Sequence, residues 1–114
     1  MPIAEPRATA RRLHFAGWTL DSGSRTLIHP GGQTSHLNRS TLALLLAFLE
    51  HPGMTLSRER LSAVLQREYT AYDRLIDVHV SRIRRLLGRH ADGGPYIRTL
   101  RSEGYVFVVP VRAE

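Results

Sequence analysis

The chain has 114 residues and a mass of 12.9 kDa, and its 16 basic and 10 acidic side chains give a formal net charge of +6. This length suits one domain with a core of its own, and the absence of cysteine excludes a disulfide framework, a thiol nucleophile and a cysteine–zinc site. The longest apolar run, 42–49, is far shorter than the roughly 20 residues of a membrane span, and no charged and then apolar leader opens the chain. We therefore expect a cytoplasmic protein with an anionic partner.

The N-terminal third of the chain predicts a linker followed by a small antiparallel sheet. Residues 1–12 combine Pro, Ala and Arg without apolar periodicity, which is typical of a linker or a disordered N-terminus. Between residues 13 and 37, sparse apolar residues alternate in short stretches that turn-forming residues interrupt at 21–24 and 29–32. This pattern predicts three or four short strands, which begin a domain extending over residues 13–111.

Two helices are expected next. Four leucines between 42 and 49 follow the i, i+3, i+4, i+7 spacing of a helical face. Asn38 or Ser40 can cap this first helix, and the residues at 51–53 end it. A second helix begins at Ser57, a good N-cap. The residues expected on its inner face are Leu61, Val64 and Leu65.

The C-terminal half predicts a loop, a third helix and a hairpin. Residues 66–72 lack an apolar stripe, and the third helix spans about 73–89. Residues 96–111 predict two strands joined by a turn at 102–104, where Gly104 supplies a backbone conformation that other residues resist. The predicted fold class is therefore α+β, in the order sheet, three helices and hairpin.

The third helix separates apolar from basic side chains on a helical wheel. Its inner arc consists of Ile76, Val80, Ile83 and Leu87. The opposite arc consists of Arg74, Val78, Ser81, Arg82, Arg85 and Arg89. A merely solvated face usually mixes charges of both signs, whereas this arc carries no acid. It therefore favours nucleic acid binding, with the helix in the major groove. A GC-rich genome would explain the lack of Lys equally well, so the position of the Arg residues, and not their number, is the argument.

The residues on the flank of this helix and in the hairpin can each have a structural role or a role in contacting DNA. Arg84 lies about two turns from Asp77 and can serve in a structural ion pair or in a phosphate contact. His79 lies on a partly apolar flank, which predicts a packed or half-exposed side chain unless DNA passes there. Arg98 and Arg101 make the hairpin a second basic element, which can enter a minor groove or can be an ordinary solubilised edge.

Two runs of sequence carry a family resemblance. They are 74–87 (RLIDVHVSRIRRLL) and 96–107 (YIRTLRSEGYVF), with shorter matches at 15–21 (FAGWTLD), 37–38, 44–45, 52–53 and 56–61 (LSRERL). In order and spacing, residues 13–109 resemble the OmpR/PhoB-type winged-helix effector domain of two-component response regulators. The resemblance implies a winged helix-turn-helix with an N-terminal four-stranded antiparallel sheet, three helices and a C-terminal β-hairpin wing.

The same resemblance implies transcription control through sequence-specific binding of double-stranded DNA, usually by two copies head to tail on a direct repeat. The third helix would lie in the major groove and the wing, about 96–109, at the minor groove, with Arg82 reading a base. The DNA-binding positions that the wheel and the resemblance supply are Arg74, His79, Ser81, Arg82, Arg84, Arg85, Arg89, Thr99, Arg101 and Tyr105. The loop that commonly approaches RNA polymerase supplies Arg67, Glu68, Tyr69 and Tyr72. A receiver domain and a histidine kinase would be partners in a full-length protein, and no catalytic residue, metal or cofactor is expected.

The sequence departs from the family pattern at four places. At the start of the first helix, Asn38 and Thr41 stand in place of the common Thr-x-x-Glu, which loses the capping box but keeps a cap. Ser81 stands where many relatives carry Arg, which weakens one phosphate contact. Residues 65–66 (LQ) replace the frequent Trp-Gly, so that Tyr69 and Tyr72 are the candidates for that loop's DNA contact. Residues 102–103 (SE) replace the usual Gly-x of the wing and bring an acid near the expected minor groove.

Other assignments remain open at this point. The chain lacks a receiver domain, so it is either a separate piece of a response regulator, which the run at 77–82 (DVHVSR) favours, or the domain of a one-component, membrane-fused regulator. An enzyme is not expected, because the six His are scattered without metal-binding spacing. An RNA-binding or protein-docking module could use the same basic face. RNA recognition, however, relies on exposed aromatics. The aromatics expected in the core are Phe15, Trp18, Tyr105 and Phe107.

Overall fold

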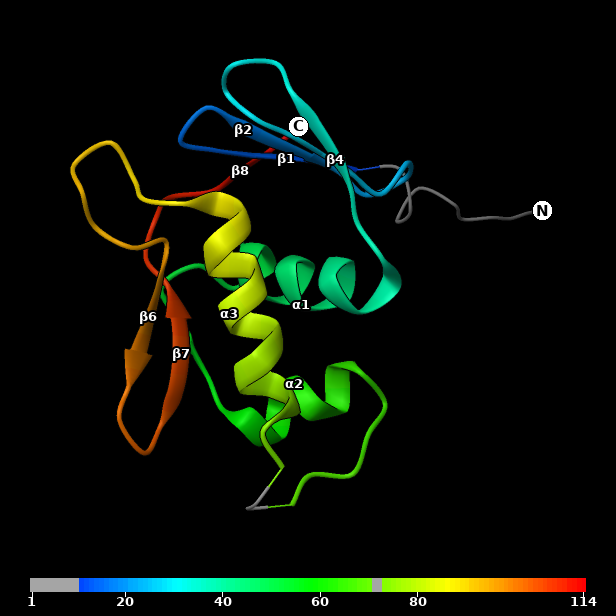
Figure 1. Cartoon of the computed structure of the whole chain (residues 1–114), viewed down its shortest axis with the longest axis vertical. Coiled ribbons are helices and arrows are strands. Elements are labelled where there is room, and N and C mark those ends of the chain that lie inside the picture. Colours follow the sequence, from blue (N-terminus) through cyan, green and yellow to red (C-terminus); the bar gives the residue numbers. More distant parts are fainter. Residues whose placement is uncertain (1–10, 71–72) are drawn as a thin grey trace.

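The computed structural model describes residues 11–70 and 73–114, which form two sheets and three helices (Figure 1). The elements in chain order are β1 (Arg12–Phe15), β2 (Trp18–Asp21), β3 (Thr26–Ile28), β4 (Thr34–His36), α1 (Arg39–Glu50), β5 (Thr55–Leu56), α2 (Arg58–Val64), α3 (Leu75–Leu87), β6 (Ile97–Leu100), β7 (Gly104–Phe107) and β8 (Arg112–Ala113). The predicted order of sheet, three helices and hairpin is confirmed. Most of the expected N-terminal linker, residues 1–10, lies outside the described residues.

The N-terminal sheet is antiparallel throughout, with the strand order β4-β3-β2-β1-β8. Its inward side chains alternate along the strands, so that Leu13, Phe15 and Leu20 are each at most 2% exposed. The four strands expected from the sequence are present. A fifth, β8, pairs Leu13 with Ala113 and lies beyond residue 111, where the sequence placed the end of the domain. A two-residue strand carries too little alternation to be predicted from its own sequence.

The helices begin where side-chain caps are available. The Oδ1 atom of Asn38 accepts from the backbone amide of Thr41 at 2.9 Å, so Asn38, and not Ser40, caps α1. The hydroxyl of Ser57 likewise accepts from the amide of Arg60 at 3.1 Å and caps α2. The expectation that Val64 faces inward is wrong: α2 ends after seven residues, Val64 is 40% exposed, and the short helix buries Leu61 and Ser62 instead.

The second sheet has the strand order β5-β7-β6 and contains the wing, which is the hairpin β6–β7 (Figure 1). Strand β5, which the sequence pattern did not predict, pairs Thr55 with Val106 and Leu56 with Tyr105. Gly104 has a φ of +140°, and a Cβ atom there would overlap the carbonyl oxygen of Leu56. This glycine is therefore required by the close approach of β5 as well as by its backbone conformation.

An aromatic cluster joins the two sheets. The ring of Phe15 in β1 meets the rings of Phe107 and Tyr96 edge to face, with centroids 5.3 and 5.9 Å apart. The indole Nε1 of Trp18 donates to the hydroxyl of Tyr96 at 3.0 Å. The core expected for Phe15, Trp18, Tyr105 and Phe107 is confirmed, since each is at most 4% exposed. No helix in the described part of the chain combines the length and apolarity needed to cross a membrane.

Candidate nucleic-acid interface

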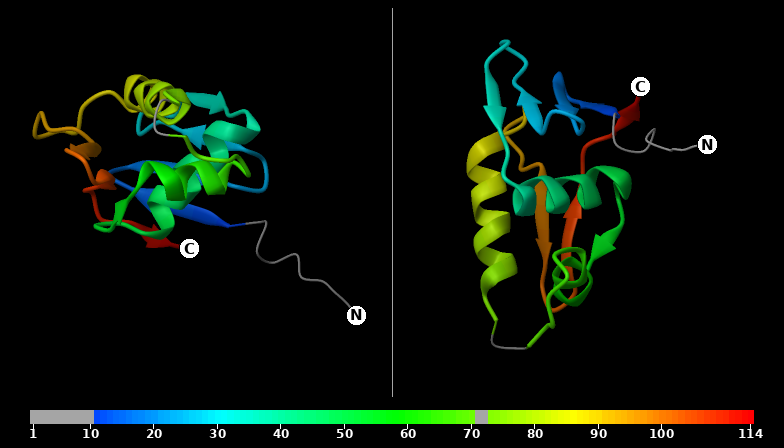
Figure 2. Two further views of the ribbon diagram at one scale, coloured as in Figure 1. Left: turned by 90° about the horizontal axis from the view of Figure 1, so that it is seen from below. Right: turned by 90° about the vertical axis from the view of Figure 1, so that its right-hand side faces the viewer.

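The third helix packs one arc of its surface into the core and leaves the other free. Its inner residues Ile76, Val80, Ile83 and Leu87 are at most 5% exposed. The exposed residues are Arg74, Val78, Ser81, Arg82, Arg85 and, just beyond the helix, Arg89. In the second view of Figure 2, α3 runs along one edge of the molecule, with the other elements to one side of it. The two arcs predicted from the helical wheel are therefore confirmed. We call the exposed set the arginine arc.

The arginine arc carries positive charge that the protein itself leaves unpaired. Within residues 11–70 and 73–114, Arg82 and Arg85 form no hydrogen bond or ion pair. Arg74 is 85% exposed and reaches Asp77 only at 3.9 Å. Arg89 donates to the backbone carbonyl of Gly93 at 2.9 Å and keeps its charge. Such a surface can take up phosphate oxygens and base edges without first breaking a strong internal pair.

The start of α3 is held by Asp73. One carboxylate oxygen accepts from the amide of Leu75 at 2.9 Å, and the other accepts from Arg67 at 2.6 Å. These bonds lower the pKa of Asp73, with the backbone bond as the larger cause. The helix ends at Leu87, before Gly88, whose φ is +69°. It is thus two residues shorter at each end than the predicted span 73–89.

Asp77, the acid at the edge of the arginine arc, is turned toward α2 and the wing. It accepts from the Nε atom of Arg58 at 2.8 Å, and the hydroxyl of Tyr105 donates to the same carboxylate oxygen. Burial alone would raise the pKa of Asp77, but the bonds from Tyr105 and Arg58 outweigh it, and the net effect is a lowered pKa. The same contact raises the pKa of Arg58, and burial followed by the bond to Asp77 raises the pKa of Tyr105.

Arg84 joins α3 to the wing and does not pair with Asp77. Its guanidinium donates twice to the carbonyl of Ile97, at 3.0 and 3.2 Å, and once to the hydroxyl of Thr99 at 2.6 Å. It also lies over the ring of Tyr105, 5.5 Å from the centroid. The ion pair considered for Arg84 is therefore not formed, and Arg84 instead bonds neutral acceptors in β6 and lies over the Tyr105 ring of β7. The phosphate contact stays a prediction.

The wing carries its free charges on β6 and at its tip. Arg98 and Arg101 are exposed and form no ion pair within the described residues. Glu103, also exposed, lies in the turn after Arg101, and Ser102 there has a φ of +65°. Thr99 is exposed on the same strand, whereas Tyr105 is 4% exposed and its hydroxyl is engaged by Asp77.

His79 is buried on the inner side of α3. It is 7% exposed, and its Nδ1 atom has no hydrogen-bond partner among the described residues. Burial, followed by the positive charges of Arg82 and Arg67, lowers its pKa. Burial therefore disfavours the charged imidazolium, and little of the side-chain surface is available to a ligand.

The loop between α2 and α3 contains the residues expected at a polymerase contact. Arg67 is paired with Asp73, Glu68 is exposed, and Tyr69 is 38% exposed. Tyr72 lies outside the described residues.

Sequence reasoning did not single out Arg58, whose side chain contacts Asp77 of α3. A cation in the first turn of a helix opposes the helix dipole, so Arg58 directly after the Ser57 cap signals a nearby acid. The acid is Asp77, which is 19 residues away along the chain and not identifiable from α2 alone.

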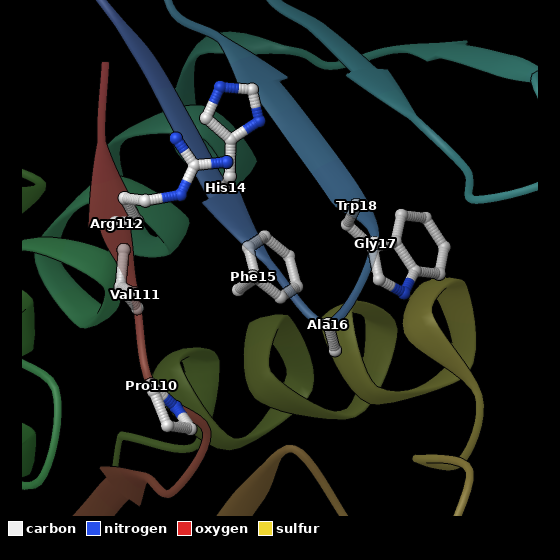
Figure 3. A pocket seen from close by; sticks show the side chains of 8 residues that line it. All are labelled: His14, Phe15, Ala16, Gly17, Trp18, Pro110, Val111 and Arg112. Atoms are coloured by element: carbon white, nitrogen blue, oxygen red, sulfur yellow. The ribbon is translucent and has the colours of Figure 1, made fainter.

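Two cavities lie near the junction of the five-stranded sheet with the C-terminal end of α3. One, of about 320 Å³, lies between the β1–β2 turn and residues 110–112, and Figure 3 shows the side chains from both segments around it. The other, of about 370 Å³, lies along the end of α3. Its lining residues are Ser81, Arg84, Arg85, Gly88, Arg89, Pro95 and Tyr96. The second cavity continues the arginine arc, whereas the first belongs to the five-stranded sheet.

Comparisons with known proteins agree with this geometry. The family model described as "Transcriptional regulatory protein, C terminal" matches residues 32–107. The chain is 38% identical over 122 residues to the transcriptional regulatory protein CpxR of Klebsiella pneumoniae, covering 93% of this chain and 53% of the relative. It is 39% identical over 106 residues to the aerobic respiration control protein ArcA of Escherichia coli, covering 92% and 44% respectively. The chain thus spans about half the length of these curated relatives.

Solved structures show the same fold. The DNA-binding domain of CpxR from E. coli superposes with a TM-score of 0.77 at 37% identity, covering 85% of this chain and 95% of that one. The RstA DNA-binding domain of Klebsiella pneumoniae, solved in complex with the RstA box, superposes with a TM-score of 0.74 at 30% identity, covering 85% and 96%. The chain therefore belongs to the family of C-terminal domains of transcriptional regulatory proteins, the OmpR/PhoB-type winged-helix effector domains.

Proposed function

We propose that this domain controls transcription by binding double-stranded DNA sequence-specifically, as the output domain of a two-component response regulator. The single observation that carries the proposal is the arginine arc, an exposed helix face with unpaired guanidinium groups at Arg82 and Arg85. An α-helix fits the major groove, where Arg bonds guanine edges and flanking phosphates. The relative RstA, 30% identical to this chain, was solved as a complex with its DNA box, which supports the same use of the fold here.

The arc and the wing divide the contacts between them. Arg82 stands at the centre of the arc and is assigned to a base edge. Arg74, Ser81, Arg85 and Arg89 lie around it and are assigned to the flanking phosphates. The wing tip with Arg101 is assigned to the adjacent minor groove, whose narrow, electronegative form attracts Arg.

The wider partners follow from the family. Two copies are assigned to a direct-repeat operator, head to tail, and the loop that includes Arg67, Glu68 and Tyr69 is assigned to RNA polymerase. A receiver domain, phosphorylated by a histidine kinase, is assigned to the part of a full-length regulator that this chain does not cover. The setting of all these partners is the bacterial cytoplasm.

Selection of bound sequences from random duplexes tests this function. We expect one recurring motif, with half-sites spaced by about one helical turn of DNA. The selected duplex is then titrated at several salt concentrations. With about five Arg neutralising phosphates, log affinity falls against log salt with a slope near −4 to −5. A slope near zero, or equal binding of single-stranded RNA in direct competition, contradicts the proposal.

A further inference from the structure

Four side chains connect α2, α3 and the wing in one network. Arg58 lies in α2, Asp77 and Arg84 lie in α3, and Tyr105 lies in β7. Arg58 donates to Asp77 at 2.8 Å and to the Tyr105 hydroxyl at 3.3 Å, and that hydroxyl donates to Asp77. The guanidinium carbons of Arg58 and Arg84 lie over the Tyr105 ring, 5.1 and 5.5 Å from its centroid. We call this set the clamp.

The clamp engages side chains that the family resemblance assigns to DNA. Tyr105 is 4% exposed, and its hydroxyl already has two partners. Arg84 donates three hydrogen bonds to Ile97 and Thr99 in the wing. A direct contact with DNA would require these hydrogen bonds to break. The free energy lost with them would be comparable with the free energy gained from the new contact. Arg82 and Arg85, which lie close to Arg84 on the same helix, can contact DNA without breaking an internal hydrogen bond.

Asp77 is the member of the clamp whose charge opposes phosphate, and its Oδ1 atom already accepts from Arg58 and Tyr105. A carboxylate repels phosphate, and a side chain that is 25% exposed at the edge of the arginine arc lowers the affinity for any duplex. The contacts of Asp77 indicate a structural role instead. Asp77 is the acceptor that Arg58 and Tyr105 share, so it ties the start of α3 to both α2 and β7.

We propose that Asp77 is a positioning residue, which acts through Arg58 and Tyr105 to hold the wing at a fixed angle to α3. This inference rests on the proposed function, because the angle matters only if α3 and the wing must meet neighbouring grooves of one duplex. Discrimination between the operator and random DNA then depends on the clamp, whereas the charge-driven affinity for any duplex depends on the arginine arc.

The test compares Asp77→Asn with Glu59→Gln in the whole 114-residue chain. Both variants remove one negative charge, but Glu59 is exposed on α2 and outside the clamp. We expect Asp77→Asn to bind random duplex at least as well as the wild type, since a repulsive charge is gone, and to bind the selected operator less well. The ratio of the two affinities falls about tenfold, the size of one lost charged hydrogen bond. Glu59→Gln leaves the ratio unchanged. If the two variants change the ratio equally, the proposal is wrong.

Tyr105→Phe provides a second variant that keeps the buried ring and therefore the fold. We expect the same loss of ratio as in Asp77→Asn, and we expect the double variant to lose no more than the worse single variant. Additive losses overturn the proposal. A tyrosine hydroxyl that bonded a phosphate directly would instead weaken operator and random duplex alike in Tyr105→Phe and would leave the ratio as in the wild type, which would also overturn the proposal.

A measurement without DNA separates this inference from the proposed function. Residual dipolar couplings of the backbone amides report the orientation of β6 and β7 relative to α3. We expect them to change in Asp77→Asn and to remain as in the wild type in Glu59→Gln. An unchanged orientation in Asp77→Asn overturns the clamp whatever the DNA result. A wild-type chain that does not discriminate operator from random DNA overturns the proposed function alone.

Discussion

Strand β1 of the five-stranded sheet and the unit formed by α3 and the wing differ in how their charged side chains are paired. In β1 of the five-stranded sheet, Arg12 faces Asp21 at 3.5 Å, and His14 meets Glu114 at 2.5 Å. In the wing, Arg98 and Arg101 are exposed without an acid partner in the described part of the chain. The arginine arc continues this unpaired charge along α3.

The difference separates structural charge from charge that is available to a ligand. Net charge alone gives +6 for the whole chain and does not say where an anion would bind. The pairing of each charge does indicate where an anion would bind. An exposed arginine that has no carboxylate partner within the protein keeps its electrostatic attraction for an anion from outside. This difference supports the proposal that the ligand binds α3 and the wing, with the five-stranded sheet as their scaffold.

The largest expected effect concerns the packing of the wing. Gly104→Ala places a Cβ against the backbone of Leu56, at a φ of +140°, and is expected to lower the free energy of unfolding by about 3 kcal/mol or more. Gly32→Ala, in the β3–β4 turn at a φ of +98°, meets nothing within 4 Å and is expected to cost about 1 kcal/mol. Urea unfolding of the two variants measures the contrast, and equal losses would show that the wing is not the more tightly constrained region.

The next effect concerns the arginine arc against the scaffold sheet. Arg82→Ala is expected to weaken operator binding by roughly 1–3 kcal/mol and to relax specificity at one base step. Arg12→Ala removes the same charge from the five-stranded sheet, where a paired, exposed group contributes at most about 1 kcal/mol to stability and nothing to the interface. Binding titrations on the operator and on singly substituted operators distinguish the two. Equal losses on operator and random duplex would reassign Arg82 to phosphate positioning.

A smaller effect is expected at the wing tip. Arg101→Ala removes an exposed guanidinium that is assigned to the minor groove and the backbone beside it. We expect a loss of about 1 kcal/mol on operator and random duplex alike, with the slope of log affinity against log salt reduced by about one. A loss confined to one operator sequence would make the wing a reader of sequence.

The smallest effect is a pH dependence of stability. The pKa of His79 in the folded chain lies below its ordinary value of 6.5, because burial and then the charge of Arg82 disfavour the imidazolium. As the pH falls below 6.5, the unfolded chain therefore takes up this proton first, and the free energy of unfolding decreases; above 6.5 the stability is complete. His79→Gln is expected to flatten this dependence. His36→Gln, which changes an exposed residue of β4, serves as the control and should leave it as in the wild type.

Sequence patterns predicted much of the fold and of the arc. The i, i+3, i+4 spacing of apolar residues placed α1 and α3 and told the inner from the outer arc of α3, because helical periodicity is a local property. The sequence patterns failed where an element is short, or where its contacts come from residues far away in the sequence. Val64 follows the spacing of an inner residue but lies at the end of a seven-residue helix, and β5 and β8 have two residues each.

The sequence by itself determined that one helix carries an acid-free basic arc opposite an apolar one, and that a basic hairpin follows it. Only the tertiary structure decided which arginines are free. Arg58 and Asp77 are 19 residues apart, Asp77 and Tyr105 are 28 apart, and Arg84 and Thr99 are 15 apart, so no local pattern records their contacts. Hydrogen bonds and ion pairs depend on distances of a few ångströms in space, and packing of α2, α3 and the wing against one core sets those distances.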